Sequence, residues 1–200
     1  MRALEETDRE DSRLARISYV DGQSAPPEVG DVFAKLEARG AKVINLYRAM
    51  GHSQAALLPF IKMGNSLLTK ARLEPRLREM AILRVAILSG SRYEWQQHEA
   101  LARELGVTEA QVADLAEWEA SSGFDDKEKA ALTFVDEVAQ QIAVSDDTFA
   151  RLGEHFDETE IVELTMSIGF WGMVARFLVA LQVDLEEGSG TSGQELLGGK

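Results

Sequence analysis

Apolar positions recur at helical spacing along most of the chain, and helix-capping residues stand at the breaks between these runs. No run alternates apolar and polar side chains convincingly, as a half-buried strand would. We therefore predict an all-α fold of about eight or nine helices. Short helices are expected near residues 28–39 and 44–50, and longer ones near 53–70, 75–89, 92–105 and 157–183. Further helices are expected to start near residues 108, 125 and 145, of which the first and last are short.

Several predicted boundaries carry specific local signals. Pro75 suits the first turn of a helix, where its missing N–H would have no partner in any case. Gly90 and Gly106 are placed to end the two helices that follow. Thr108 with Gln111 has the spacing of a capping box. Further N-terminal signals stand at Ser53, Asp125, Ser145 and Asp157.

Composition indicates one globular domain. The chain has 200 residues, of which 45% are hydrophobic and 28% charged, enough for a sizeable core. We place this domain at residues 17–185. Residues 1–16 are charged and aperiodic, and residues 186–200 are rich in Gly and Ser, so we expect a mobile N-terminal segment and a flexible tail.

Charge and cysteine content exclude several functions. A formal net charge of -13 makes the surface repel phosphate backbones and anionic lipid, so we expect neither nucleic acid nor membrane as a partner. The absence of cysteine rules out disulfides, thiolate metal ligands and a thiol peroxidase cycle run by this chain. Without an apolar signal segment near Met1, the expected location is cytoplasmic.

The segment 164–183 approaches the length and apolarity of a membrane span. Arg176 lies deep within it, and Thr165 and Ser167 dilute it. Gly169 and Gly172 suit close helix packing in a soluble core. We therefore interpret the segment as a central or subunit-interface helix.

One turn of the 92–105 helix carries the candidate chemistry. Glu94 and His98 share a face with Leu101 and Leu105, while polar residues occupy the opposite side. An unpaired buried charge costs several kcal/mol or shifts its pKa toward the neutral form, so ionisable groups are seldom placed inward without a role. We take this turn as the candidate reactive centre.

Glu79 is expected to join this pair. It lies on the apolar face of the preceding helix, and the short connection at Gly90 predicts an antiparallel hairpin. Glu79 stands about eleven residues before the turn and His98 about eight after it, or roughly 16 and 12 Å along the helix axes. The three groups could therefore converge, with Tyr93 and Ser91 adding hydroxyls at the rim.

Three alternatives stay open at this point. Glu94 and His98 could form an ordinary ion pair one helical turn apart, with Glu79 paired to Arg84 or Arg176. Arg84 and Arg176 could instead bind an anionic substrate. A metal site is the weaker interpretation because the usual two-His, one-carboxylate spacing is missing. We assign no chemistry to the lone histidines His52 and His155 or to the aromatic residues Tyr47, Trp95, Trp118, Phe170 and Trp171.

Three blocks of sequence resemble the carboxymuconolactone decarboxylase family, which includes the alkyl hydroperoxide reductase D (AhpD) branch. They are LREMAILRVAILSGSRYEWQQHEALARELGVTEAQV in the middle, NLYRAMGHSQAALLPF before it and EIVELTMSIGFWGMVARFLVAL after it. The resemblance spans about residues 17–185. It implies an AhpD-like helical fold that assembles into homo-oligomers, trimers or hexamers, with sites near subunit contacts.

The resemblance also implies roles for single residues. In the peroxidase branch a Glu matching Glu79 is the base, two cysteines stand where this chain has Ser91 and Glu94, and a His matching His98 joins the proton relay. Both cysteines are missing here, so the resemblance implies an acid–base site without thiol chemistry.

We therefore expect a lyase that needs no cofactor or metal and acts by proton transfer on a small carboxylated lactone or carbonyl compound, by decarboxylation, isomerisation or hydration. His98 would donate the proton, Glu94 would orient it and Glu79 would be the second proton-transfer group. Tyr93 would hold a substrate oxygen, with Ser91, Arg84 and Arg176 as further substrate-binding residues. The alternatives are an AhpD-like peroxidase relative without thiol activity and a non-catalytic oligomeric module that binds a small ligand.

Overall fold

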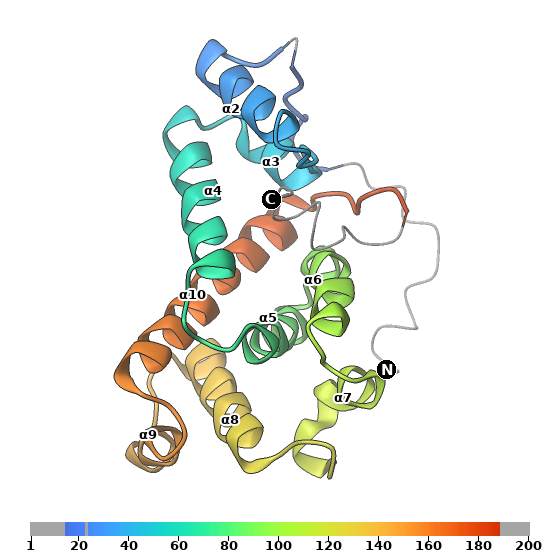
Figure 1. Ribbon diagram of the computed structural model, residues 1–200. Helices are drawn as coiled ribbons and strands as arrows, with labels where there is room; N and C mark the ends of the chain where they lie inside the picture. The colour runs from blue at the N-terminus through green and yellow to red at the C-terminus, as the bar shows by residue number, and fades with distance from the viewer. Residues whose placement is uncertain (1–14, 23, 189–200) are drawn as a thin grey trace.

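The computed structural model describes residues 15–22 and 24–188, and every regular element within those ranges is helical (Figure 1). The all-α prediction is confirmed. The terminal segments 1–14 and 189–200, expected to be mobile, lie outside the described residues.

The described residues form nine α-helices and one 3₁₀-helix. Their bounds are α2 Pro27–Glu37, α3 Asn45–Met50, α4 Gln54–Thr69, α5 Pro75–Ser89, α6 Arg92–Glu104, α7 Glu109–Asp114, η1 Leu115–Ala120, α8 Asp126–Gln141, α9 Asp146–Gly153 and α10 Glu158–Leu181. The sequence analysis missed η1, because neither Gly nor Pro separates it from α7. The bend lies at Glu117, whose backbone leaves the helical region.

Local capping chemistry sets most helix starts as predicted. The side chains of Ser53, Thr108, Asp125, Ser145 and Asp157 each accept a hydrogen bond from the backbone three residues later. At the other end of two helices, Gly90 (φ 65°) and Gly106 (φ 99°) adopt left-handed backbone that a side chain would strain.

Helix α5 lies at the centre and packs against α6, α8 and α10 (Figure 1). Every residue from 77 to 86 is buried, including two arginines and Glu79. Because α5 has neighbours around its circumference, its sequence has no clear polar face. The predicted α5–α6 hairpin forms, with Gly90 at its turn.

Helix α10 packs along α5 and also contacts α4, α6, α8 and α9. It is the one helix in the described part of the chain that is long and apolar enough to cross a membrane, and half of its apolar window is buried inside the protein. That burial supports our interpretation of α10 as a central helix. Its outer face remains apolar, with Val162, Met166, Met173 and Val179 exposed.

Residues at both domain boundaries are held more firmly than expected. The Arg16 backbone N–H donates to the Leu181 carbonyl. Glu186, which we assigned to the flexible tail, is buried, and its carboxylate accepts hydrogen bonds from the Asn45 backbone N–H (2.6 Å) and the Tyr93 hydroxyl (2.5 Å). The assignment of residue 186 to a flexible segment is therefore wrong, because its acceptors complete the N-terminus of α3.

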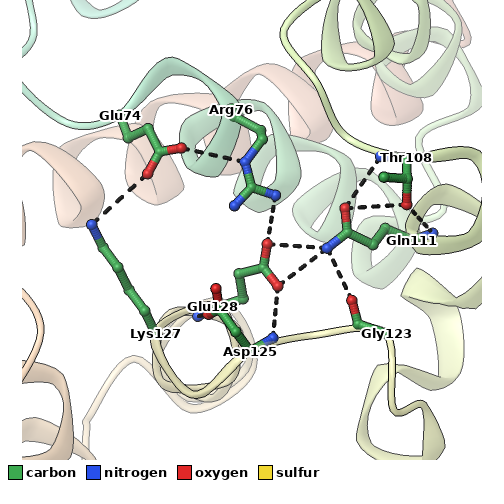
Figure 2. A network of polar contacts seen from close by, with 8 residues as sticks. All are labelled: Glu74, Arg76, Thr108, Gln111, Gly123, Asp125, Lys127 and Glu128. Carbon is green, nitrogen blue, oxygen red and sulfur yellow. Dashed lines mark hydrogen bonds and ion pairs between the residues drawn. The ribbon is translucent and has the colours of Figure 1, made fainter.

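Another buried carboxylate, that of Glu128, connects α5, α7 and α8 (Figure 2). Glu128 forms an ion pair with Arg76 (2.5 Å) and accepts hydrogen bonds from the Gln111 amide (3.0 and 3.1 Å) and the Asp125 backbone N–H (2.8 Å). We call Arg76, Gln111, Asp125 and Glu128 the Glu128 junction. Its members come from three elements, because Asp125 and Glu128 both stand at the start of α8, so the junction fixes how α5, α7 and α8 meet.

Candidate active site

A cavity of about 380 Å³ lies among α2, α3, α4, α6 and α10. Its walls are mostly apolar, with Leu36, Ile44, Ile61 and Leu178 among them. The buried side chains of Glu94, Gln97, His98 and Trp171 line it, and we call their region the inner end. A pocket of this size with a few polar groups at one end is typical of a site for a small molecule.

A chain of hydrogen bonds fixes His98 at the inner end. The Glu79 carboxylate lies 2.7 Å from His98 Nδ1, and the Trp171 indole N–H donates to His98 Nε2 over 2.9 Å. An indole nitrogen can only donate, so Nε2 must be the acceptor and the ring proton belongs on Nδ1, facing Glu79. Both nitrogens of His98 are therefore engaged within the protein.

Glu79 lies behind His98 and is fully buried. Its second oxygen accepts a hydrogen bond from Arg78 Nε (3.2 Å), and Arg78 also donates to the Leu67 carbonyl (3.3 Å). The predicted convergence of Glu79 with His98 therefore occurs. The alternative that paired Glu79 with Arg84 or Arg176 is wrong, because Arg78 and His98 occupy it.

Glu94 differs from its neighbours because it is buried without a partner. Its side chain is 1% exposed, and neither carboxyl oxygen has a hydrogen-bond partner among the described residues. Burial raises the pKa of Glu94 well above the ordinary carboxyl value. The expected alternative of a Glu94–His98 ion pair is not formed. Glu94 therefore favours the protonated form and lines the cavity.

Tyr93 and Ser91 do not take the positions predicted for substrate contacts. The Tyr93 ring lines the cavity, but its hydroxyl donates to Glu186 and accepts the Leu46 backbone N–H (3.2 Å). Burial and the Glu186 carboxylate raise the pKa of Tyr93. Ser91 caps α6 by accepting the Glu94 backbone N–H and does not line the cavity. Holding a substrate oxygen does not fit either hydroxyl.

The two arginines predicted to bind an anionic substrate lie away from the cavity. Arg84 makes two hydrogen bonds with Asp136 (2.7 and 2.8 Å) and donates to two carbonyls of η1. Arg176 is exposed and donates to the Gly172 carbonyl one turn earlier on α10 (2.7 Å). A substrate-binding role fits neither position. The sequence shows that each arginine interrupts an apolar stretch, but not which helix supplies its acceptors.

Sequence reasoning missed several residues of the cavity. Trp171 and Tyr47 were treated as core aromatics, although Trp171 orients His98 and Tyr47 lines the cavity. Burial raises the pKa of Tyr47 to about 12, and no hydrogen bond engages its hydroxyl within the described residues. Gln97, beside His98 in the YEWQQH block, was overlooked although it lies on the inward face of α6. Across the described residues, no cluster of His, Asp and Glu is arranged to hold a metal ion.

Sequence comparison connects this site to a known family. The model of the carboxymuconolactone decarboxylase family matches residues 54–137, a range that contains Glu79, Glu94 and His98. The uncharacterized protein YdfG of Bacillus subtilis (strain 168) is 30% identical over 93 residues. That match covers 46% of this chain and 63% of YdfG, so it spans less than two thirds of the relative's length.

Solved structures extend the similarity to most of the fold. A protein of unknown function from Agrobacterium tumefaciens, suggested to be the antioxidant defence protein AhpD, is 26% identical, with a TM-score of 0.64 over 70% of this chain and 96% of its own. A peroxidase-related protein with an alkylhydroperoxidase AhpD core from Ralstonia eutropha JMP134 has a TM-score of 0.76 at 17% identity, covering 88% and 94%. A cysteine-to-alanine variant of the debrominase Bmp8, in complex with 2,3,4-tribromopyrrole, has a TM-score of 0.72 at 20% identity, covering 88% and 95%. The last two are similar to this chain in fold alone.

Proposed function

We propose that the chain is a member of the carboxymuconolactone decarboxylase family, whose model matches residues 54–137, and that it is an enzyme that transfers protons to and from a small carbonyl compound. Its AhpD-like fold is consistent with this proposal. The observation that carries the proposal is the Glu94 carboxyl, which lines the cavity, is buried and has no partner among the described residues. A carboxyl kept protonated by burial can act as a general acid near neutral pH.

The geometry supports different roles for Glu94 and His98 from those expected at first. Glu94 is the proton donor and acceptor, because it lines the cavity and its carboxyl oxygens have no hydrogen-bond partner among the described residues. His98 has both ring nitrogens engaged, so it is a positioning residue that Glu79 and Trp171 hold against the inner end. Tyr47 takes the role first expected of Tyr93, because a phenol with its pKa near 12 stays protonated and can donate to a substrate oxygen.

Two reactions use this arrangement with a balanced set of protons. In isomerisation, Glu94 protonates the substrate oxygen and the resulting carboxylate takes a proton from carbon, which gives the enol. Glu94 then protonates a different carbon and regains its proton from the enol hydroxyl. In decarboxylation, the bond to the carboxylate breaks, its electron pair moves into the conjugated carbonyl, and Glu94 protonates that oxygen. A solvent proton then adds to carbon and the enol hydroxyl returns its proton to Glu94, so one proton is taken from solvent for each CO₂ released. Decarboxylation is the reaction in the family's name, and the lyase assignment is part of the proposal.

The two alternatives have less support. A thiol peroxidase cycle needs a cysteine, and this chain has none. A non-catalytic ligand-binding module would explain the apolar cavity but leaves no use for an unpartnered buried carboxyl, which costs free energy to keep. Assembly into a homo-oligomer and a cytoplasmic location stay predictions. The exposed apolar residues of α10 supply a surface for the first of these.

The test compares Glu94→Gln with a matched control on the same helix. The enzyme would be screened against conjugated keto acids and carboxylated lactones, following CO₂ release and loss of ultraviolet absorbance. We expect Glu94→Gln to lower kcat by about 10² to 10⁴, the usual contribution of a positioned proton donor. Glu104→Gln, exposed at the end of α6, should leave kcat unchanged.

Equal turnover in the wild type and Glu94→Gln would refute the role of Glu94. Absence of turnover on every member of the panel, with tight binding of several, would support the ligand-binding alternative. Circular dichroism of both variants would confirm that each retains the helical fold.

A further inference from the structure

The charges around the cavity are opposite to those of the chain as a whole. The protein carries 34 acidic and 21 basic residues, yet three cations line the cavity and Glu94 is its single acidic lining residue within the described chain. The cations are Lys35, Arg39 and Lys62, and all three are exposed. We call the part of the cavity that they surround its mouth.

The three cations come from separate places in the fold. Lys35 is on α2, Arg39 follows that helix, and Lys62 is on α4. No side chain of the three has an ion pair or hydrogen bond with another described residue, whereas the side chains of other cations, such as Arg76 and Arg84, are paired. In a chain with excess acid, cations left unpaired at one opening create a local positive potential that attracts anions.

The cavity changes character between its mouth and its inner end. Its mouth is cationic and exposed, its walls are apolar with residues such as Leu36, Ile61 and Leu68, and its inner end holds the protonated Glu94. An anionic group at the inner end would lose its hydration and meet no cation from among the lining residues there. A molecule that matches all three parts has one charged end, an apolar body and an uncharged reactive end.

We propose that this cavity binds an amphipathic anion whose headgroup contacts Lys35, Arg39 and Lys62 and whose apolar body extends inward to Glu94. The inference rests on the proposed function in that the bound molecule is the substrate of the same site. In this proposal, Lys35, Arg39 and Lys62 determine which molecules the cavity binds. The anionic headgroup is then a handle distant from the reacting atoms. It is not the carboxylate that a decarboxylation at Glu94 would release, so the inference favours isomerisation among the two proposed reactions.

Isothermal titration calorimetry with octanoate and octanamide tests the proposal, because the two probes share an apolar chain and differ in charge. We expect the wild-type protein to bind octanoate about tenfold tighter than octanamide, equivalent to about 1.4 kcal/mol. The difference should shrink between about 0.03 and 0.3 M ionic strength, because the screening length falls about threefold. Octyl phosphate forms a further arm: whichever anion binds tighter assigns the headgroup to carboxylic acids or to phosphate esters.

Two triple variants separate local from overall charge. Lys35→Gln/Arg39→Gln/Lys62→Gln should bring the octanoate and octanamide affinities within about threefold of each other. The control Lys70→Gln/Arg92→Gln/Arg151→Gln removes three exposed cations that do not line this cavity, and it should keep the preference. Equal affinities of both probes for wild type, no binding of any probe, or the same loss in both variants would overturn the inference.

Failure of the anion-binding inference can be distinguished from failure of the proposed catalytic role of Glu94. If the wild type shows no preference for anions but Glu94→Gln still abolishes turnover, the cation site is wrong and the proton-transfer function stands. If the preference and its loss in the mouth variant are observed while Glu94→Gln keeps full turnover, the binding inference stands and the catalytic role of Glu94 falls.

Discussion

Two buried glutamates of this protein have opposite surroundings. Glu128 is 3% exposed and is bound by Arg76, the Gln111 amide and the Asp125 backbone N–H (Figure 2). Glu94 is 1% exposed and has no hydrogen-bond partner among the described residues. The two residues are the same amino acid at nearly the same burial, so the contrast comes from their partners alone.

The contrast separates a structural group from a reactive one. Donors from three elements bind the Glu128 carboxyl and connect α5, α7 and α8, so its removal would leave buried donors without their acceptor. Glu94 has no such donors, and burial therefore shifts it toward the neutral acid. Glu94 lines the cavity, and its carboxyl oxygens have no hydrogen-bond partner among the described residues. The position of a buried carboxyl thus matters less for function than the donors that the fold brings to it.

Removing the Glu128 side chain is expected to give the largest change in stability. Glu128→Ala leaves Arg76 and the Gln111 amide without their shared acceptor, and we expect the free energy of unfolding to fall by about 3 kcal/mol, the lower end of the range for a buried pair because Arg76 is partly exposed. Urea denaturation followed by circular dichroism would measure this. Glu104→Ala, exposed on α6, is the control and should change stability by under about 0.5 kcal/mol. A loss below about 1 kcal/mol would mean that the Glu128 junction contributes little to folding.

The pH dependence of stability should show the opposite behaviour of Glu94. Its pKa is raised in the folded protein, so between the ordinary carboxyl value of 4.5 and the raised value the native state holds a proton that the unfolded state has released. The wild type should therefore lose stability relative to Glu94→Gln as the pH rises through this window, by up to about 1.4 kcal/mol per pH unit. Parallel urea titrations of both proteins at several pH values would measure the difference. A difference that does not vary with pH would show that Glu94 titrates normally.

The smallest expected effect distinguishes the two tyrosines of the cavity. Tyr93→Phe removes a donor to Glu186 and an acceptor for the Leu46 N–H, so the free energy of unfolding should fall by about 1 kcal/mol while kcat changes less than about twofold. Tyr47→Phe should leave stability nearly unchanged and lower kcat, because its hydroxyl has no partner within the described protein. Thermal unfolding and turnover of both variants would decide. The reverse pattern would return the substrate contact to Tyr93.

The helices and the central pair of the site could be predicted from the sequence. Caps such as Thr108 and Asp125 act within one turn, so their effect is encoded locally. The contact between Glu79 and His98 followed from helical rise and a short turn at Gly90, which constrain an antiparallel hairpin. In each of these cases the interacting residues are fewer than twenty positions apart along the chain.

The contacts of the other proposed site residues could not be predicted from the sequence, because their partners are distant along the chain. Arg84 was taken for a substrate contact because the sequence does not reveal that Asp136 on α8 binds it. Tyr93 was assigned to substrate because its partner, Glu186, lies 93 residues later in a segment expected to be flexible. Trp171 was passed over for the same reason, since its indole reaches His98 from α10.

The sequence by itself therefore determined the helices, their caps and the inward face that carries Glu94 and His98. Periodicity and capping are properties of one or two turns, and neighbouring residues are sufficient to specify them. Only the tertiary structure decided which buried groups are satisfied. It brought three donors to Glu128, an indole to His98 and no described hydrogen-bond donor to the Glu94 carboxyl, and it left three cations of the cavity lining without ion-pair partners among the described residues. Desolvation and hydrogen bonding depend on what surrounds a side chain in space, and these surroundings come from helices far apart in the chain.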